Sequence, residues 1–483
     1  MEKMSDNLKA KATRALFWSS VDRFSSQGIS FVFSIFLARI LDISDYGIVA
    51  MIVVFMAVAQ VFVDSGFSPA LIRKPDLNEE DKSTAFYFNI VVGLACYGIL
   101  FIASPLIADF YDEPLLSPII RVTGLSIIFN SLCVVQRALF TIAVDFKTQA
   151  IISLACTVIS GVVGLVMAYN GYGVWALVAQ STISTFLNFV LLWLCSRWRP
   201  VTGFSKASFH YLFNFGSKLL ASGLLDTLYN NAYPIVIGKF YNSAQLGLYS
   251  RAQGYASLPS SNITGILQRV TFPVLSLMQD DDEKLANNYR RLLRMSAFVV
   301  FPLMIGLAAI ADPLIRVLIT SKWAGCIIYL QIICFGMMLY PIHALNLNLL
   351  QVKGRSDLFL RLEILKKVIG VCALCITIPF GITAMCIGLV VVSVVALYIN
   401  TYYTGKLLSL GFLMQIKDLV PFFILSMLVG LLMYYVPTSI NNDLYRLVSG
   451  GLIGIVSYVG LAALFRIKEF NELINLIRKN GRK

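Results

Sequence analysis

Long apolar stretches separated by short polar connectors follow one another along almost the whole chain. Each is about 18 residues long or more, enough at ~1.5 Å per residue for a helix to cross the ~30 Å hydrocarbon core of a bilayer. The fourteen stretches are residues 14–41, 44–70, 83–108, 116–140, 147–169, 173–195, 213–240, 244–278, 290–311, 324–351, 358–380, 382–404, 416–436 and 444–466. The pattern predicts an all-α polytopic membrane protein with about 14 transmembrane helices.

The first stretch differs from an ordinary membrane span because Asp22 and Arg23 lie near its middle. Ser19, Arg23, Ser26 and Ser30 recur at helical spacing, so one stripe of this helix is polar. A charge at the bilayer centre costs about 2.5–3.5 kcal/mol on insertion scales, which makes such a residue a candidate for function. The alternative interpretation is a self-neutralising pair between packed helices.

An internal repeat appears at an offset of 200 residues. Residues 36–50 (FLARILDISDYGIVA) align with residues 236–250 (VIGKFYNSAQLGLYS), and Gly47 corresponds to Gly247. Both halves start from the same side of the membrane, so the repeat is parallel, an arrangement in which two lobes rock around a central cavity. We predict two pseudo-twofold-related six-helix lobes plus two extra helices: an N-terminal lobe (1–200), a C-terminal lobe (201–405), and two additional helices with a basic cytoplasmic tail (406–483).

The second half begins with helices that are also polar along one side. In the stretch 213–240, polar residues or Pro recur every four positions: Lys218, Ser222, Asp226, Asn230 and Pro234. The next stretch, 244–278, is the least lipid-like, and we expect it to line a water-filled space. Its Arg251 and Arg269 are ~27 Å apart along a helix axis, so they would lie near opposite ends of a cavity. Pro259 lies between them and could kink the helix.

Composition agrees with a membrane protein: 58% of the residues are hydrophobic and only 13% are charged, with a mean hydropathy of +0.77. In a soluble chain, a net charge of +13 would suggest nucleic acid. Here the Lys and Arg residues lie in short loops, mostly on the side of the two termini, so they report topology instead. The positive-inside rule predicts a multi-pass protein with both termini in the cytoplasm and no nucleic-acid partner.

Cysteine usage does not indicate a metal or redox site. The closest pair, Cys372 and Cys375, has no His near it and is typical of small residues at a helix interface. We therefore expect no metal and no cofactor.

Five segments in order resemble a known family: LARILDISDYGIVAM (37–51), DSGFSPALIRK (64–74), GYGVWALVAQ (171–180), LYSRAQGYASLPSSNI (248–263) and FPVLSLMQDD (272–281). They are similar to the polysaccharide transporter family of the multidrug/oligosaccharidyl-lipid/polysaccharide (MOP) flippase superfamily, of the Wzx or colanic-acid-exporter type. The resemblance implies a non-enzymatic flippase in the bacterial cytoplasmic (inner) membrane. It would move an undecaprenyl-diphosphate-linked oligosaccharide by alternating access, beside the polymerase and glycosyltransferases of the same pathway.

Such a substrate has a diphosphate and sugars to hold. Arg suits bidentate phosphate contacts, and Arg23, Arg251 and Arg269 are the intramembrane cations available. Aromatic faces and amides bind sugars, and the candidates are Tyr229, Asn230 and Tyr233. Ordinary helix packing is the alternative for these last residues.

Energy coupling and motion have candidates as well. No nucleotide-binding motif is present, so we expect coupling to an ion gradient or the membrane potential, with Asp226 as the coupling carboxylate and Asp22 positioning Arg23. Neutralisation of cavity cations is the competing role for both. Gly66, Pro234 and Pro259 are the candidate hinges.

Two other function classes stay open. A multidrug or cation-coupled extruder would carry an acidic, aromatic cavity, whereas Arg is at least as frequent as Asp among the candidates here. An integral-membrane polymerase or ligase would need a long external loop with catalytic groups, and the connectors are short.

Overall fold

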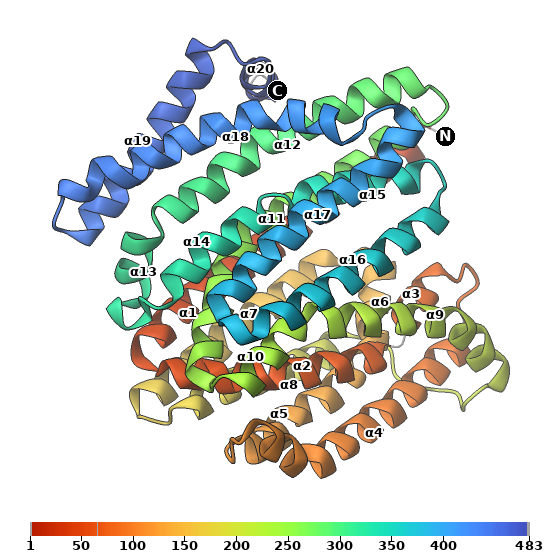
Figure 1. Cartoon of the computed structure of the whole chain (residues 1–483). Coiled ribbons are helices and arrows are strands. Elements are labelled where there is room, and N and C mark those ends of the chain that lie inside the picture. Colours follow the sequence, from red (N-terminus) through yellow and green to blue (C-terminus); the bar gives the residue numbers. More distant parts are fainter. Residues whose placement is uncertain (1, 65, 481–483) are drawn as a thin grey trace. The chain divides into compact units, whose positions relative to one another are not determined.

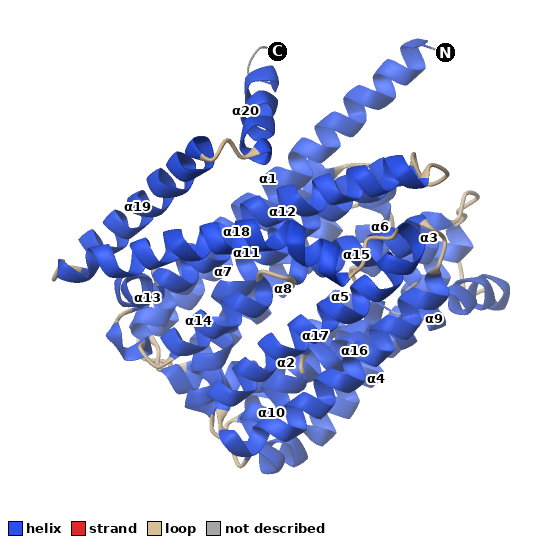
Figure 2. Cartoon of the chain, turned by 45° about the horizontal axis from the view of Figure 1, so that its top comes forward, coloured by secondary structure: helices blue, strands red, loops and turns tan. Residues whose placement is uncertain are grey.

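Helices form every element of the described chain (Figures 1 and 2). The structure is a computed structural model that describes residues 2–64 and 66–480, with side-chain surroundings for residues 17–64 and 66–475. The last residues of the expected basic tail, 481–483, lie outside the described residues. Packing divides the chain into two compact units, which meet in the sequence between Gly247 and Leu248. The lobe boundary at residue 200 stays a prediction.

The first unit is built around α2, which packs against α4, α5, α8 and α9. Separately, α1 packs along α7, and α7 packs along α8. The helices are α1 (Glu2–Ile40), α2 (Ile43–Asp64), α3 (Phe67–Arg73), α4 (Glu79–Tyr111), α5 (Leu116–Ser131), α6 (Val134–Ile142), α7 (Phe146–Tyr169), α8 (Val174–Cys195), α9 (Lys206–Asn230) and α10 (Ala232–Phe240). The start of α11 (Ser243–Ser276) also belongs to this unit.

Local sequence explains where several of these helices begin. At the start of α4, the Asn78 side chain accepts from the Asp81 amide at 2.8 Å, and the Asp81 carboxylate accepts from the Asn78 amide at 3.2 Å. This capping box satisfies amides that a helix start leaves without intrahelical partners. The Lys74 ammonium donates to Asp81 at 2.6 Å, so the fully buried carboxylate is also charge-compensated.

The second unit is organised around two helix pairs, α12 with α18 and α14 with α17. Besides the rest of α11, it contains α12 (Asp282–Ala309), α13 (Ala311–Ile319), a 3-10 turn (Ser321–Trp323), α14 (Cys326–Met337), α15 (Tyr340–Val352), α16 (Ser356–Thr377), a 3-10 turn (Ile378–Phe380), α17 (Ile382–Leu408), α18 (Phe412–Tyr435), a 3-10 turn (Val436–Ser439), α19 (Asp443–Leu464) and α20 (Lys468–Asn480). Cys372 and Cys375 are exposed on α16, so neither packs in an interface of this unit, contrary to the sequence-based interpretation.

Buried polar groups fix the packing of the second unit. The amides of Asn346 on α15 and Gln415 on α18 bond to each other in both directions, at 3.0 and 3.1 Å. The Thr404 hydroxyl of α17 donates to the same Asn346 oxygen at 2.8 Å. Because a buried amide is costly unless it is hydrogen-bonded, this satisfied cluster specifies how the three helices fit together.

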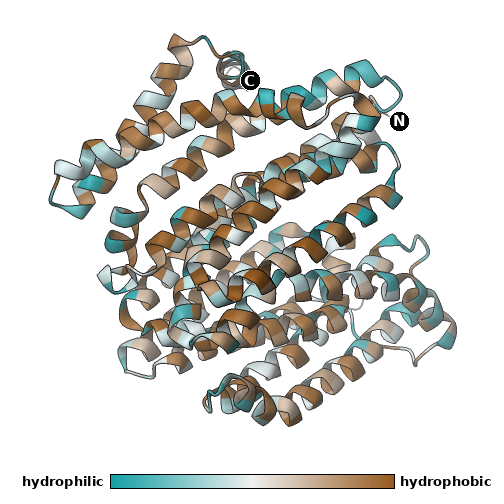
Figure 3. Cartoon of the chain, in the orientation of Figure 1, coloured by the Kyte–Doolittle hydropathy of each residue, from teal (hydrophilic) through white to brown (hydrophobic). Residues whose placement is uncertain are grey.

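Nine of the described helical segments are long and apolar enough to cross a membrane, and the bent pair α5 and α6 makes a tenth. Figure 3 shows hydrophobic residues along the lengths of the helices and hydrophilic ones gathered at helix ends and loops. The prediction of an all-α polytopic membrane protein is therefore confirmed. The count of 14 spans stays a prediction: the polar helices α1, α9, α11 and α16 are outside this set.

Candidate functional site

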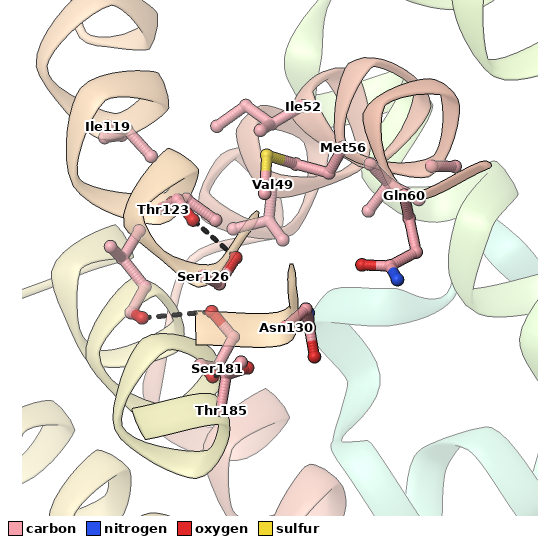
Figure 4. A pocket seen from close by; sticks show the side chains of 13 residues that line it. Val49, Ile52, Met56, Gln60, Ile119, Thr123, Ser126, Asn130, Ser181 and Thr185 are labelled. Carbon is pink, nitrogen blue, oxygen red and sulfur yellow. Dashed lines mark hydrogen bonds between the residues drawn. The ribbon is translucent and has the colours of Figure 1, made fainter. Parts of the chain in front are cut away.

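A cavity of about 370 Å³ lies inside the first unit, between α2, α5 and α8 (Figure 4). Its volume falls within the ~300–1,000 Å³ typical of small-ligand sites. The apolar lining residues are Val49, Ile52, Val53, Met56, Ala57, Ile119 and Val178, and the polar ones are Gln60, Thr123, Ser126, Asn130, Ser181 and Thr185. The lining contains no aromatic and no charged side chain.

Helical spacing brings the polar lining together. Thr123, Ser126 and Asn130 recur at three and four residues on α5, and Ser181 and Thr185 are four apart on α8. Each set therefore lies on one face of its helix. Figure 4 shows these two faces and the Gln60 amide of α2 around the same space.

The hydroxyls of Ser126, Ser181 and Thr185 donate to carbonyls of their own helices. Ser126 donates to the Thr123 carbonyl at 2.6 Å, Ser181 to the Val178 carbonyl at 3.0 Å, and Thr185 to the Ser181 carbonyl at 3.0 Å. A hydroxyl carries one donor hydrogen and two acceptor lone pairs. With the hydrogen directed at the backbone, each oxygen offers acceptor capacity to a ligand.

Each of the two amide side chains in the lining is hydrogen-bonded to a charged residue. The Arg137 guanidinium donates to the Asn130 carbonyl oxygen at 2.8 Å and to that of Asn188 at 3.3 Å. On α2, the Gln60 amide donates to Asp64 at 2.9 Å. Arg137 also attracts Asp64 electrostatically. Gln60 is thus bonded to a negative charge, Asp64, and Asn130 to a positive one, Arg137.

A bend in the chain sets the position of Arg137. The helices α5 and α6 meet at an angle of 42°, and the Leu132 carbonyl at the bend accepts from the Trp193 indole at 3.0 Å. The indole satisfies a carbonyl that an interrupted helix leaves without its usual partner. Arg137 follows on α6 and reaches back to Asn130 on α5.

The polar stripe predicted on α1 faces α7 in part. Asp22 accepts from the Ser26 hydroxyl at 3.2 Å, and the same hydroxyl lies 3.1 Å from the Ser153 hydroxyl of α7. Arg23 is exposed. The structure therefore joins Asp22 to a small hydroxyl cluster between these two helices.

The candidates on α9 and α10 have different surroundings from one another. Asp226 and Asn230 are exposed, Tyr229 is half-buried, and Tyr233 is buried. Because α9 packs against α2, α3 and α4 while α1 packs along α7, the two leading helices have separate principal neighbours in this unit.

The two arginines of α11 lie in the second unit. The Arg251 guanidinium carbon is 5.7 Å from the centre of the fully buried Trp323 ring, a cation–π distance. Arg269 is exposed. Their predicted role in substrate binding stays a prediction, as do the roles of the α1, α9 and α10 candidates.

The three candidate hinges differ in local structure. Gly66 has φ +69° between α2 and α3, and a Cβ there would lie 2.6 Å from the Gly216 Cα. Glycine is therefore required at this break, both for the left-handed backbone and for the close approach. Pro234 is in the first turn of α10, just after the break from α9, whereas Pro259 lies inside the uninterrupted α11. Hinge motion at all three stays a prediction.

Sequence reasoning missed the cavity. Arg137 was not among the candidate residues, although it lies within α6. The available signal was Gln60 and Asp64, an i,i+4 polar pair in the last turns of a largely apolar helix. Of the two partners of Arg137, Asn130 is seven residues away across the bend and Asn188 is 51 residues away, so only the fold brings all three together.

Comparison with known proteins gives consistent matches. The family model described as "Polysaccharide biosynthesis protein" matches residues 36–328. The teichuronic acid biosynthesis protein TuaB of Bacillus subtilis (strain 168) is 27% identical over 302 residues, and the match spans 62% of either chain. The succinoglycan biosynthesis transport protein ExoT of Rhizobium meliloti (strain 1021) is 23% identical over 481 residues, 98% of this chain and 97% of ExoT.

Solved structures show the same fold. The lipid II flippase MurJ, in an inward closed conformation, aligns with a TM-score of 0.78 at 14% identity and covers 95% of this chain and 100% of its own. An inward-facing multidrug resistance MATE family transporter of the MOP superfamily aligns with a TM-score of 0.62 at 15% identity, covering 84% of this chain and 98% of its own. The chain therefore has the MOP-type helical fold that the sequence predicts.

Proposed function

Because the chain belongs to the polysaccharide biosynthesis protein family, we propose that it is a flippase for lipid-linked oligosaccharides. It moves an undecaprenyl-diphosphate-linked repeat unit from the cytoplasmic to the outer leaflet of the bacterial inner membrane, for assembly of a surface polysaccharide. The observation that carries this proposal is the match to a polysaccharide transport protein over 98% of the chain. The MurJ-like fold supports it.

The proposed mechanism is alternating access of two lobes around a polar path. Arg23, Arg251 and Arg269 hold the diphosphate, since Arg presents paired donors that match phosphate oxygens. Tyr229, Asn230 and Tyr233 contact sugar, and the polyprenyl tail stays in lipid. Gly66, Pro234 and Pro259 absorb the bending. Both termini face the cytoplasm, because most Lys and Arg residues lie on their side of the membrane.

Export of cationic drugs is the less favoured alternative. Cationic drugs are typically held by carboxylates and aromatic faces. The cavity lining has neither. A neutral polar lining suits an oligosaccharide better.

Deletion of the gene in its natural host tests the proposed function. We expect loss of the surface polysaccharide and accumulation of the lipid-linked oligosaccharide in the cytoplasmic leaflet, both reversed by a plasmid copy. Normal surface polysaccharide together with unchanged lipid-linked intermediates would contradict the proposal.

A further inference from the structure

The chemistry of the cavity between α2, α5 and α8 selects one part of a lipid-linked oligosaccharide. We propose that this cavity binds a neutral, hydroxyl-rich sugar ring and excludes the diphosphate. The inference rests on the proposed function for its biological substrate, but its binding chemistry stands on the geometry of the first unit alone.

Acceptor oxygens dominate what the lining offers. The hydroxyl hydrogens of Ser126, Ser181 and Thr185 are directed at backbone carbonyls, so their oxygens accept from a ligand. The Gln60 amide nitrogen donates one of its two hydrogens to Asp64, and the side-chain oxygen of Gln60 adds a fourth acceptor. A sugar ring supplies several hydroxyl donors and matches such a set.

A phosphate or diphosphate does not match it. Ionised phosphate carries only acceptor oxygens, and these would face the acceptor oxygens of the lining. The cation bonded to the lining, Arg137, already donates to Asn130 and Asn188 and is attracted by Asp64. Burying an anion in this lining without a dedicated positive partner is unfavourable.

The donor groups present are few and suit a neutral ligand. Arg137 donates to the side-chain oxygen of Asn130, so the side-chain amide nitrogen of Asn130 points away from Arg137 as a donor. The Thr123 hydroxyl oxygen is buried without a hydrogen-bond partner among the described residues. A hydroxyl group is both donor and acceptor, so it can satisfy both side chains, whereas an apolar group would leave them unsatisfied.

The apolar half of the lining completes the match. Val49, Ile52 and Met56 on α2 and Ile119 on α5 add surface without hydrogen-bonding groups to the same lining. Sugar rings have apolar C–H faces as well as hydroxyl edges, so one ring contacts both halves. Fully hydrated ions have no such apolar face.

A binding measurement on the purified full-length protein tests the inference. The probes are a panel of methyl glycosides of common neutral hexoses. Their binding is detected by saturation-transfer difference NMR, and inorganic pyrophosphate is the competitor. The variants are Thr185→Val, which removes a lining hydroxyl and keeps the side-chain shape, and the double variant Thr185→Val with Ser126→Ala. The matched control is Thr157→Val on α7, where the hydroxyl also donates to a carbonyl four residues back, at 2.8 Å, but lies outside the lining.

At least one glycoside should bind the parent protein and resist displacement by pyrophosphate. Loss of one hydrogen bond should weaken binding about three- to ten-fold in Thr185→Val, and more in the double variant, while Thr157→Val binds as the parent does. Absence of glycoside binding, displacement by pyrophosphate, or equal weakening in Thr157→Val would overturn the inference. Translocation of the lipid-linked substrate is read out separately, so flipping without glycoside binding refutes only the sugar site, and glycoside binding without flipping refutes only the proposed function.

Discussion

The backbones of Gly47 and Gly247 pass each other with no room for a side chain on either residue. A Cβ at Gly47 would overlap the carbonyl oxygen of Ser243, and a Cβ at Gly247 would overlap that of Ile43. The repeat, with its offset of 200 residues, aligns position 43 with 243 and position 47 with 247, so the two contacts are equivalent. The starts of α2 and α11 therefore cross in a two-fold-like manner at glycines that the repeat aligns.

Alanine at either of these glycines should destabilise the protein. Overpacking a tight contact typically costs ~1–3 kcal/mol, and here the obstacle is backbone, which yields less easily than a side chain. The measurement is the thermal midpoint of purified protein, followed by size-exclusion chromatography. Gly98 on α4 is the control, because a Cβ there has nothing within 4 Å. Gly98→Ala should be neutral or stabilising by up to about 1 kcal/mol. Equal midpoints for Gly47→Ala and Gly98→Ala would contradict the close crossing.

Replacing Arg137 should lower the stability of the protein. Arg137→Met removes two charge-assisted hydrogen bonds and leaves Asp64 without its electrostatic partner, at a cost of about 1.5–3 kcal/mol. Adding Asp64→Asn should recover at most a small part of the lost stability, because Asp64 is exposed and its attraction to Arg137 is therefore weak. Thermal midpoints of the two single variants and the double variant give the coupling. Additive effects would show that Arg137 and Asp64 do not interact.

The fold was largely predictable because its signal is local. Each apolar stretch identified in the sequence contains one or two of the described helices, and the connector at residues 170–173 separates α7 from α8. Breaks inside stretches were missed, such as those at Asn231 and Leu132. A break need not change the apolar pattern of the sequence when a tertiary partner satisfies the interrupted backbone. The Trp193 indole does this at Leu132.

The site was less predictable because it is built from weak signals on separate helices. Ser126, Ser181 and Thr185 are ordinary residues in membrane helices, and nothing in their sequence neighbourhood marks a cavity. A charged residue in an apolar stretch is a strong signal in a sequence, and Arg23 and Arg251 were candidates for that reason. Volume and hydrogen-bond direction, which single out the α2, α5 and α8 cavity, are properties of packing.

Two neighbouring arginines on α12 should differ in importance. Arg290 binds Asp418 through two bonds of 2.7 Å, and the Asp418 side chain is only 4% exposed. Arg290→Met leaves the buried Asp418 carboxylate with only the longer contact to Arg294, at 3.8 Å. It should cost several kcal/mol, at most ~3–5 because Arg290 is itself partly exposed and Arg294 remains. Arg291 pairs with Glu472 at 2.8 Å but is 60% exposed, so Arg291→Met should cost about 1 kcal/mol or less.

Urea or thermal unfolding of the two α12 variants separates them. Arg290→Lys should fall between the parent and Arg290→Met, because an ammonium lacks the bidentate geometry. Indistinguishable stabilities of Arg290→Met and Arg291→Met would show that burial of Asp418 does not decide the outcome.

Asp226→Asn should uncouple transport from an imposed gradient. The variant keeps the shape of the exposed side chain on α9 and removes its capacity to take up a proton. Flux in vesicles of the parent should respond to a proton or sodium gradient, and flux in Asp226→Asn should lose that response. Asp22→Asn is the comparison, because Asp22 is assigned to positioning Arg23. A gradient response in Asp226→Asn equal to that of the parent would remove Asp226 from the coupling step.

Translocation by the purified protein in liposomes tests the central claim most directly. The vesicles contain undecaprenyl-diphosphate-linked oligosaccharide whose sugar is radiolabelled and accessible to an added glycosidase only in the outer leaflet. The account predicts that the protein makes the inner-leaflet fraction accessible at a rate well above that of protein-free vesicles, and that it does not transport a cationic dye. Accessibility that stays at the protein-free rate, with dye transport in the same vesicles, would contradict it.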